Sequence, residues 1–142
     1  MSFAGTWYNE LNSKMILKDQ GNGLIVGTYE SAVGEFKGVA FPLTGSYDPR
    51  PEPTAQAIGF VVTWSVPAHN AYSVTSWSGQ YDGKADAIGT TWLLTSATGL
   101  LPEQDWCSTL VGQDDFIRTQ SKTAAGLGKA AARGVSHPMV RS

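Results

Sequence analysis

The stretch AYSVTSWSGQYDGKADAIGTTWLLTSA, which runs from Ala71 to Ala97, decides the expected fold. It contains two strand-like segments separated by Asp82-Gly83-Lys84, a sequence typical of a turn. Because side chains two positions apart lie on the same face of a strand, Ser73, Thr75 and Trp77 share one face. The stretch therefore predicts two antiparallel strands joined by a hairpin, with hydroxyl groups and an indole on a single face.

Working outward from this hairpin, turn-forming sequences divide the rest of the chain in the same way. The cluster Asp19–Gly23 predicts another hairpin, and Pro67–Asn70 predicts a further break. Three prolines within Asp48–Pro53 exclude ladder pairing there, because proline lacks an N–H. The expected strands cover residues 5–11, 12–18, 24–32, 39–48, 56–66, 71–81, 86–97 and 106–117. Such a series favours an all-β fold, an eight-stranded antiparallel up-and-down β-barrel, over a sandwich.

The composition agrees with one β-rich domain, which we expect over residues 1–118. The chain has 142 residues, five tryptophans and a formal net charge of −2, which disfavours non-specific binding of nucleic acid. No apolar run reaches the ~18 residues of a membrane-spanning helix. The single cysteine, Cys107, excludes an internal disulfide, so the fold depends on packing. We expect neither nucleic acid nor membrane as a partner.

Residues 119–142 form an Ala/Gly-rich tail that we expect to be poorly ordered. It carries basic side chains and no acidic one: Lys122, Lys129, Arg133 and Arg141. The whole-chain charge of −2 less the tail's +4 leaves −6 on residues 1–118. Such a patch is a weak signal for a membrane or nucleic acid, and solubility or disorder is the preferred interpretation. No signal peptide precedes the first expected strand, so either the chain is intracellular or a leader has been removed.

Several expected strands place polar side chains on the same face as large apolar ones. These residues are Trp7, Asn9, Leu11 and Ser13, then Tyr29, Ser31 and Val33, then Trp64, Trp92, Leu94 and Asp114. Buried polar atoms are costly unless they are paired, so an ordinary core would carry aliphatic residues instead. Facing inward, they predict a pocket for a small, partly polar ligand. The alternative is that the polar faces point to solvent and the tryptophans belong to an ordinary core.

The last expected strand is apolar on both faces, through Leu110 and Val111. A monomeric barrel has one polar side, so this pattern favours barrels that pack against one another in an oligomer.

Six sequence blocks, in this order, resemble the avidin and streptavidin family. They are Gly5–Asn9, Gly27–Gly34, Leu43–Gly45, Ser76–Tyr81, Trp92–Ser96 and Ser108–Gly112. The resemblance runs from about residue 5 to residue 116. It implies a barrel that binds biotin without catalysis and without a cofactor, assembles as a homotetramer and is secreted.

The resemblance also implies a role for each polar candidate. The donors to the ureido oxygen of biotin are Asn9, Ser13 and Tyr29, and the acceptors of its ureido N–H groups are Ser31 and Asp114. Thr75 is expected near the ring sulfur and Ser73 near the valerate carboxylate. Val33 and Glu35 belong to the lid, residues 32–38, which departs from the family pattern by carrying an acid at Glu35.

The remaining candidates are apolar. By resemblance, the walls of the site are Trp64, Trp77 and Trp92, with Leu94 beside them. Trp106 resembles a tryptophan that is lent to the site of a neighbouring subunit, whereas Trp7 resembles a structural core residue. Phe60 stands where the family pattern has a tryptophan behind the pocket.

An enzyme is the first alternative function. Only two histidines exist, His69 in an expected turn and His137 in the tail, so no Ser-His-Asp arrangement is credible. Asp114 and Asp115 point to opposite faces of a strand and cannot act as a pair, and the spacing of metal ligands is absent. A lipocalin-like carrier of an apolar ligand is the second alternative. It explains the barrel and the tryptophans but not the polar set around Asp114.

Overall fold

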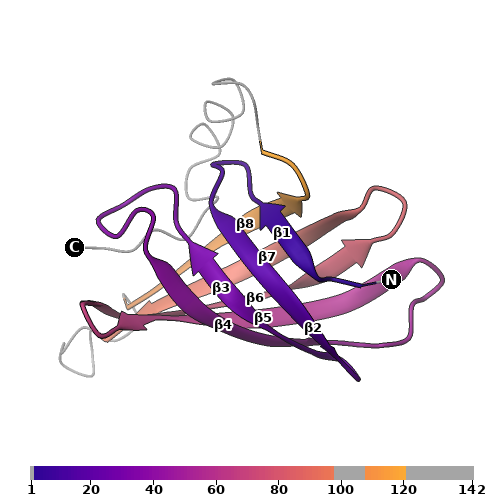
Figure 1. Cartoon of the computed structure of the whole chain (residues 1–142), viewed down its shortest axis with the longest axis horizontal. Coiled ribbons are helices and arrows are strands. Elements are labelled where there is room, and N and C mark those ends of the chain that lie inside the picture. The colour runs from indigo at the N-terminus through magenta and orange to yellow at the C-terminus, as the bar shows by residue number, and fades with distance from the viewer. Residues whose placement is uncertain (1, 98–107, 121–142) are drawn as a thin grey trace.

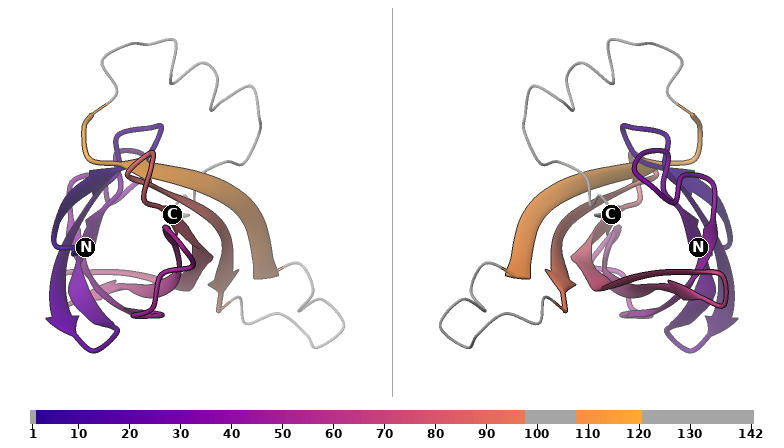
Figure 2. Two further views of the ribbon diagram at one scale, coloured as in Figure 1. Left: turned by 90° about the vertical axis from the view of Figure 1, so that its right-hand side faces the viewer. Right: turned by 90° about the vertical axis from the view of Figure 1, so that its left-hand side faces the viewer.

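The computed structural model describes residues 2–97 and 108–120. Its strands are β1 (Gly5–Tyr8), β2 (Lys14–Gly21), β3 (Leu24–Glu30), β4 (Ala40–Tyr47), β5 (Ala55–Val66), β6 (His69–Asp82), β7 (Ala87–Ser96) and β8 (Thr109–Ile117). Each strand pairs antiparallel with the next, and β8 pairs with β1 to close a barrel (Figure 1). Figure 2 shows the strands curving around a shared interior. The predicted eight-stranded antiparallel barrel is confirmed.

Strict alternation of burial along the longer strands separates the interior from the surface. In β5, Ile58, Phe60, Val62 and Trp64 are buried while the residues between them are exposed or half-buried. The adjacent strands β6 and β7 follow the same rule, so the inward faces of neighbouring strands meet in one core. The period-two pattern of the sequence therefore decides which side chains lie inside the barrel.

Glycines allow the chain to turn tightly and the strands to approach closely. Asn22 and Gly23 connect β2 to β3 with φ values of 55° and 85°, the left-handed backbone typical of a two-residue hairpin turn. At Gly79 on β6, a Cβ would collide with the backbone of Gly89 on β7. The close approach of β6 and β7 at this point therefore depends on the absence of a side chain at Gly79.

Some strand boundaries differ from those expected. β1 ends at Tyr8, not residue 11, because the chain from Asn9 to Ser13 folds into a compact loop in which Asn9 N–H donates to the Ser13 carbonyl. Leu11, expected to share an inward strand face, is half-buried in this loop. The break expected at Pro67–Asn70 is only a two-residue turn, and β6 begins at His69.

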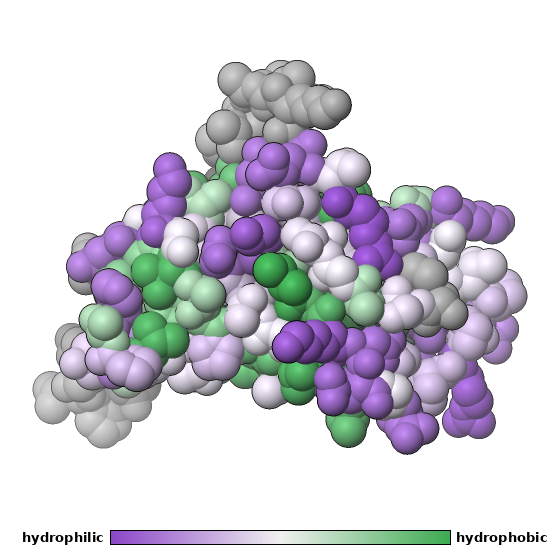
Figure 3. Space-filling view, in the orientation of Figure 1, coloured by the Kyte–Doolittle hydropathy of each residue, from purple (hydrophilic) through white to green (hydrophobic). Residues whose placement is uncertain are grey.

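The outer surface mixes polar and apolar residues. On the face that Figure 1 presents, hydrophobic groups lie scattered among hydrophilic ones (Figure 3). Elsewhere on the outside, Leu93 on β7 and Val111 on β8 face each other as cross-strand partners and are 51 % and 60 % exposed. Within residues 2–97 and 108–120, no helix is long and apolar enough to cross a lipid bilayer.

Candidate functional site

The loop between β1 and β2 brings an amide side chain into the barrel interior. Asn9 is 3 % exposed, and its Oδ1 accepts the backbone N–H groups of Leu11 at 3.0 Å and Ser13 at 2.9 Å. Its Nδ2 donates to the Tyr29 hydroxyl at 3.4 Å and to Oδ1 of Asp114 at 3.4 Å. One amide therefore shapes the loop that carries it and also connects β3 with β8.

Asp114 on β8 is fully buried, and groups from three other segments hold it. Its Oδ2 accepts the indole N–H of Trp77 at 2.9 Å, its Oδ1 accepts the Asn9 amide, and its backbone carbonyl accepts the Thr90 hydroxyl at 2.8 Å. A buried carboxylate is costly unless hydrogen bonds compensate for the lost water, and the donors Trp77 and Asn9 do so. Asp114 is thus a fixed, negatively charged acceptor inside the barrel.

Tyr29 lies beside this carboxylate and keeps its proton. Burial, followed by the negative charge of Asp114, raises the pKa of the Tyr29 phenol well above its ordinary value of 10.0. A side-chain hydrogen bond with Ser13 opposes the shift but does not outweigh it. At neutral pH the phenol therefore remains a hydrogen-bond donor next to a hydrogen-bond acceptor.

Two buried serines fix the chain where β3 leaves the barrel wall. Ser13 Oγ accepts the backbone N–H of Ala32 at 2.9 Å. Ser31 Oγ donates to the Val33 carbonyl at 2.7 Å and accepts the Val33 N–H at 3.2 Å. These bonds connect the β1–β2 loop to the lid and hold both hydroxyl groups near the polar cluster.

Aromatic rings enclose the polar cluster. The Tyr29 ring meets Trp77 at 5.0 Å between centroids and Trp64 at 5.6 Å, the latter edge to face. Phe60 stacks on Trp77 with 5.0 Å between centroids, and the indole N–H of Trp64 donates to Thr75 Oγ1 at 2.8 Å. The rings are therefore held in place by other protein groups before any ligand arrives, which lowers the entropic cost of binding.

Most of the residues expected from the sequence lie buried in the barrel interior: Asn9, Ser13, Tyr29, Ser31, Trp64, Ser73, Thr75, Trp77, Trp92, Leu94 and Asp114. In the lid, Val33 is half-buried and Glu35 is exposed. The neighbouring Phe36 turns inward and packs against Phe41, with 6.1 Å between the ring centroids. Trp106 lies outside the described residues.

Sequence reasoning missed Glu10 and Thr90. Thr90 supports the Asp114 backbone, and Glu10 Oε1 accepts the backbone N–H of Asp115 at 2.8 Å. The expected strand over residues 5–11 assigns Glu10 to the outward face, so no local pattern points to a contact with β8. For Thr90, the only available signal was its inward position, two residues before Trp92.

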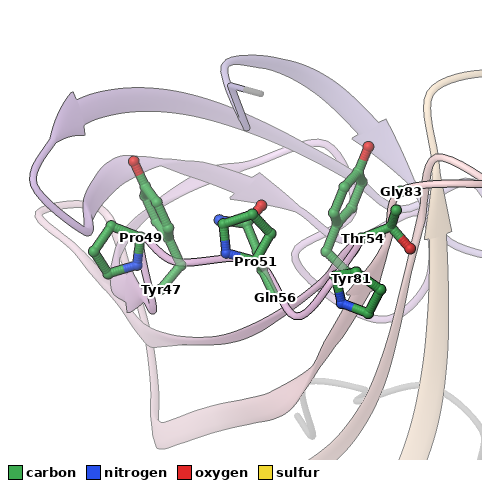
Figure 4. Close-up of a pocket in the computed structure, with 8 residues that line it drawn as sticks. Tyr47, Pro49, Pro51, Thr54, Gln56, Tyr81 and Gly83 are labelled. Atoms are coloured by element: carbon green, nitrogen blue, oxygen red, sulfur yellow. The ribbon is translucent and has the colours of Figure 1, made fainter.

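A hollow of about 360 Å³ lies outside this interior cluster, beside the β4–β5 and β6–β7 connections. Figure 4 shows the Tyr47 and Tyr81 rings on either side of Pro51 and Gln56. The two tyrosine hydroxyls donate to Asp19 at 2.7 Å and Asp86 at 2.9 Å. Both phenol hydroxyls at this hollow thus already donate hydrogen bonds within the protein.

Comparison with known proteins gives concordant results. The model of the avidin family matches residues 1–119. Hoefavidin from Hoeflea phototrophica is 32% identical over 93 residues, 64% of this chain and 51% of that protein, so the match spans about half of that relative. Two chicken (Gallus gallus) proteins are also similar. Avidin-related protein 2 is 33% identical over 121 residues, which are 82% of this chain and 77% of that protein. Avidin-related protein 1 is 32% identical over 124 residues, which are 84% of this chain and 79% of that protein.

The family match and the fold point to the same assignment. The match covers the whole described barrel, and the relatives agree with it over most of the chain. Avidin family proteins bind biotin and are not enzymes. The chain belongs to the avidin family.

Proposed function

We propose that this protein binds biotin tightly and without covalent chemistry inside the barrel, one molecule per chain. The observation that carries the proposal is the buried polar cluster, in which an amide, a protonated phenol and a carboxylate lie within hydrogen-bond reach inside an aromatic enclosure. A ligand that suits this cluster must present both donors and acceptors on a small, otherwise apolar body. The ureido ring of biotin has one oxygen between two N–H groups.

The polar residues divide into donors and acceptors for that ring. Asn9, Ser13 and Tyr29 donate to the ureido oxygen, while Ser31 and Asp114 accept its two N–H groups. The contacts of Asn9 with Tyr29 and Asp114 are long, at 3.4 Å, so little is lost when the ligand replaces them. Hydrogen bonds to a charged group are roughly twice as strong as neutral ones, and aligned bonds in a dry site polarise one another.

The apolar residues enclose the rest of the ligand. Trp64, Trp77 and Trp92, with Leu94, form the walls, and Thr75 lies near the ring sulfur. Ser73 contacts the valerate carboxylate at the open end, where Val33 and Glu35 belong to the lid. Because Glu35 is exposed, its charge acts on that carboxylate through solvent rather than through a direct bond.

The assembly we propose is a homotetramer. In support, Leu93 and Val111 form an exposed apolar pair on the outer face of β7 and β8, which a partner barrel would cover. Trp106 completes the site of a neighbouring subunit, a role that rests on the sequence resemblance alone. Secretion rests on the same resemblance.

A calorimetric titration with biotin tests the binding proposal. We expect a stoichiometry of one per chain, a large favourable enthalpy, and a change in tryptophan fluorescence as the ligand covers the indoles. Dethiobiotin, which keeps the ureido ring but lacks the sulfur, should compete for the same site. A titration without heat and without a fluorescence change would overturn the proposal.

A further inference from the structure

The seam between β1 and β8 is the shortest strand pairing in the barrel. β1 has only four residues, and its backbone pairing with β8 consists of Tyr8 opposite Ile117. By contrast, β7 and β8 pair from Ala87 opposite Ile117 to Thr95 opposite Thr109. Most of the edge of β8 that faces β1 therefore lacks a backbone partner from that strand, and side chains make the other contacts across the seam.

At the end away from the polar cluster, Arg118 closes the seam. Its guanidinium donates to the backbone carbonyls of Ala4 at 2.9 Å and Ser2 at 3.1 Å. The same group lies 3.7 Å from the centre of the Trp7 ring and 3.5 Å from the carboxylate of Asp86. This end is therefore held by an always-charged group with several partners.

At the other end, Glu10 closes the seam. Just beyond the last residue of β1, its Oε1 accepts the backbone N–H of Asp115 at 2.8 Å and so replaces a strand carbonyl. Asp115 directly follows Asp114, the buried acceptor of the polar cluster. The bond therefore fixes the backbone of β8 at the residue next to the one that we propose binds the ureido N–H.

The second oxygen of Glu10 is in an unusual position. Oε2 is buried and has no hydrogen-bond partner among residues 2–97 and 108–120. The ionisable groups whose charges act on Glu10 are Asp114 and Asp115, and Glu10 in turn acts on the Tyr29 phenol. When ionised, Glu10 adds a third negative charge to this corner and buries Oε2, for which the described part of the chain supplies no hydrogen-bond donor. When protonated, it keeps one oxygen for the Asp115 N–H, as a weaker and neutral acceptor, and the repulsion from Asp114 and Asp115 and the cost of a buried charge disappear.

We propose that Glu10 is a positioning residue for Asp114, and that its protonation tightens the β1–β8 seam and slows release of the ligand. The part that concerns the ligand rests on the proposed biotin binding, whereas the part that concerns the seam does not. The proposed effect is local, because it depends on the hydrogen bond from Asp115 N–H to Glu10 and on the charges of Glu10, Asp114 and Asp115.

The direction of the pH effect follows from the environment of Glu10. Burial, to which the charges of Asp114 and Asp115 add, raises the pKa of Glu10 from 4.5 to about 7, although backbone N–H groups oppose the shift. The folded chain thus binds this proton more strongly than the unfolded chain does. The stability that Glu10 contributes is fully present below pH 4.5 and is lost as the pH rises through about 7.

Amide hydrogen exchange of the ligand-free protein tests the seam. Exchange at Asp115, corrected for its intrinsic rate, is measured by NMR at about pH 5.5 and about pH 8.5, on either side of the raised pKa. In the wild type, protection should be several-fold higher at the lower pH. Glu10→Gln keeps an acceptor and a donor without a charge, so its protection should be high at both values. In Glu10→Ala, the Asp115 amide should be weakly protected at both pH values. The control Glu52→Gln, which changes an exposed carboxylate in the β4–β5 connection, should behave like the wild type.

The dissociation rate of biotin, measured in the same buffers, tests the link to the ligand. The wild type should release biotin several-fold faster at the higher pH, and Glu10→Gln should lose that dependence. If no variant binds biotin, the proposed function fails, but amide exchange still decides on the seam. A wild-type pH dependence that persists in Glu10→Gln, for exchange or for release, would overturn the role of Glu10.

Discussion

The indole N–H of Trp77 on β6 donates a 2.9 Å hydrogen bond to the carboxylate of Asp114 on β8, although β7 separates the two strands. The bond therefore joins, on the inner face of the barrel, two strands that do not pair with each other. It aims the carboxylate inward, next to Asn9 and Tyr29, and it fixes the indole plane against Phe60. A polar group of the cluster and an aromatic wall are thus held by the same interaction.

Replacement of the indole tests this interaction. Trp77→Phe keeps an aromatic ring that can contact Phe60 and Tyr29 but leaves Asp114 with one donor fewer. A hydrogen bond to a charged group contributes about 1.5–3 kcal/mol, so we expect the free energy of unfolding to fall by at least that amount. Urea denaturation measures the change.

Trp92→Phe is the matched control, because Trp92 is equally buried and its Nε1 has no hydrogen-bond partner among the described residues. It removes similar ring volume without breaking a bond to a carboxylate. Equal losses of stability in the two variants would mean that the Trp77–Asp114 bond contributes nothing beyond packing.

Removal of the buried charge should weaken ligand binding. Asp114→Ala takes away an acceptor for a ureido N–H and the charge that polarises the ring. We expect a loss of about 1.5–3 kcal/mol in binding free energy with the barrel still folded, as judged by circular dichroism and calorimetry. Asp114→Asn keeps an acceptor oxygen without the charge, so its binding free energy should lie between those of the wild type and Asp114→Ala. Unchanged affinity in both variants would contradict the role of Asp114.

The barrel and its inward faces could be predicted because they follow from local alternation. In β6, the polar–apolar pattern around Thr75 and Trp77 correctly indicated which side chains are buried. The ends of strands could not be predicted in this way. β1 stops early because the Asn9 side chain takes up the N–H groups of its own loop, an arrangement that the period-two pattern does not contain.

Contacts across the seam between β1 and β8 could not be predicted from the sequence either. Glu10 and Asp115 are 105 residues apart in the sequence, and their hydrogen bond exists only because the barrel closes and β1 is short. The exposure of side chains within the lid is a second feature that the sequence pattern does not predict. Glu35 is exposed while its neighbour Phe36 packs against Phe41, a choice set by tertiary packing rather than by a strand pattern.

The exposed charge in the lid leads to a prediction that depends on salt. If the valerate carboxylate of biotin arrives near Glu35, the two negative charges repel through solvent. Glu35→Asn should then tighten binding slightly, and more at low ionic strength, because the screening length is about 30 Å at 0.01 M and about 10 Å at 0.1 M salt. Titrations at the two salt concentrations measure the effect, with biotin amide, which lacks the charge, as the ligand control. Weaker binding by the Asn variant would contradict this account.

The last prediction concerns the outer face of β7 and β8. Leu93 and Val111 are exposed cross-strand partners, and a lysine in place of Val111 would put a charge into any interface that covers them. Since burying an unpaired charge is costly, Val111→Lys should shift the assembly toward smaller species in sedimentation velocity while each barrel stays folded. Leu24→Lys, at a similarly exposed position on β3, is the matched control and should leave the assembly unchanged. If Trp106 completes a neighbouring site, Val111→Lys should also speed the release of biotin, in parallel with Trp106→Ala. A wild type that sediments as a monomer would contradict the homotetramer and the shared site together.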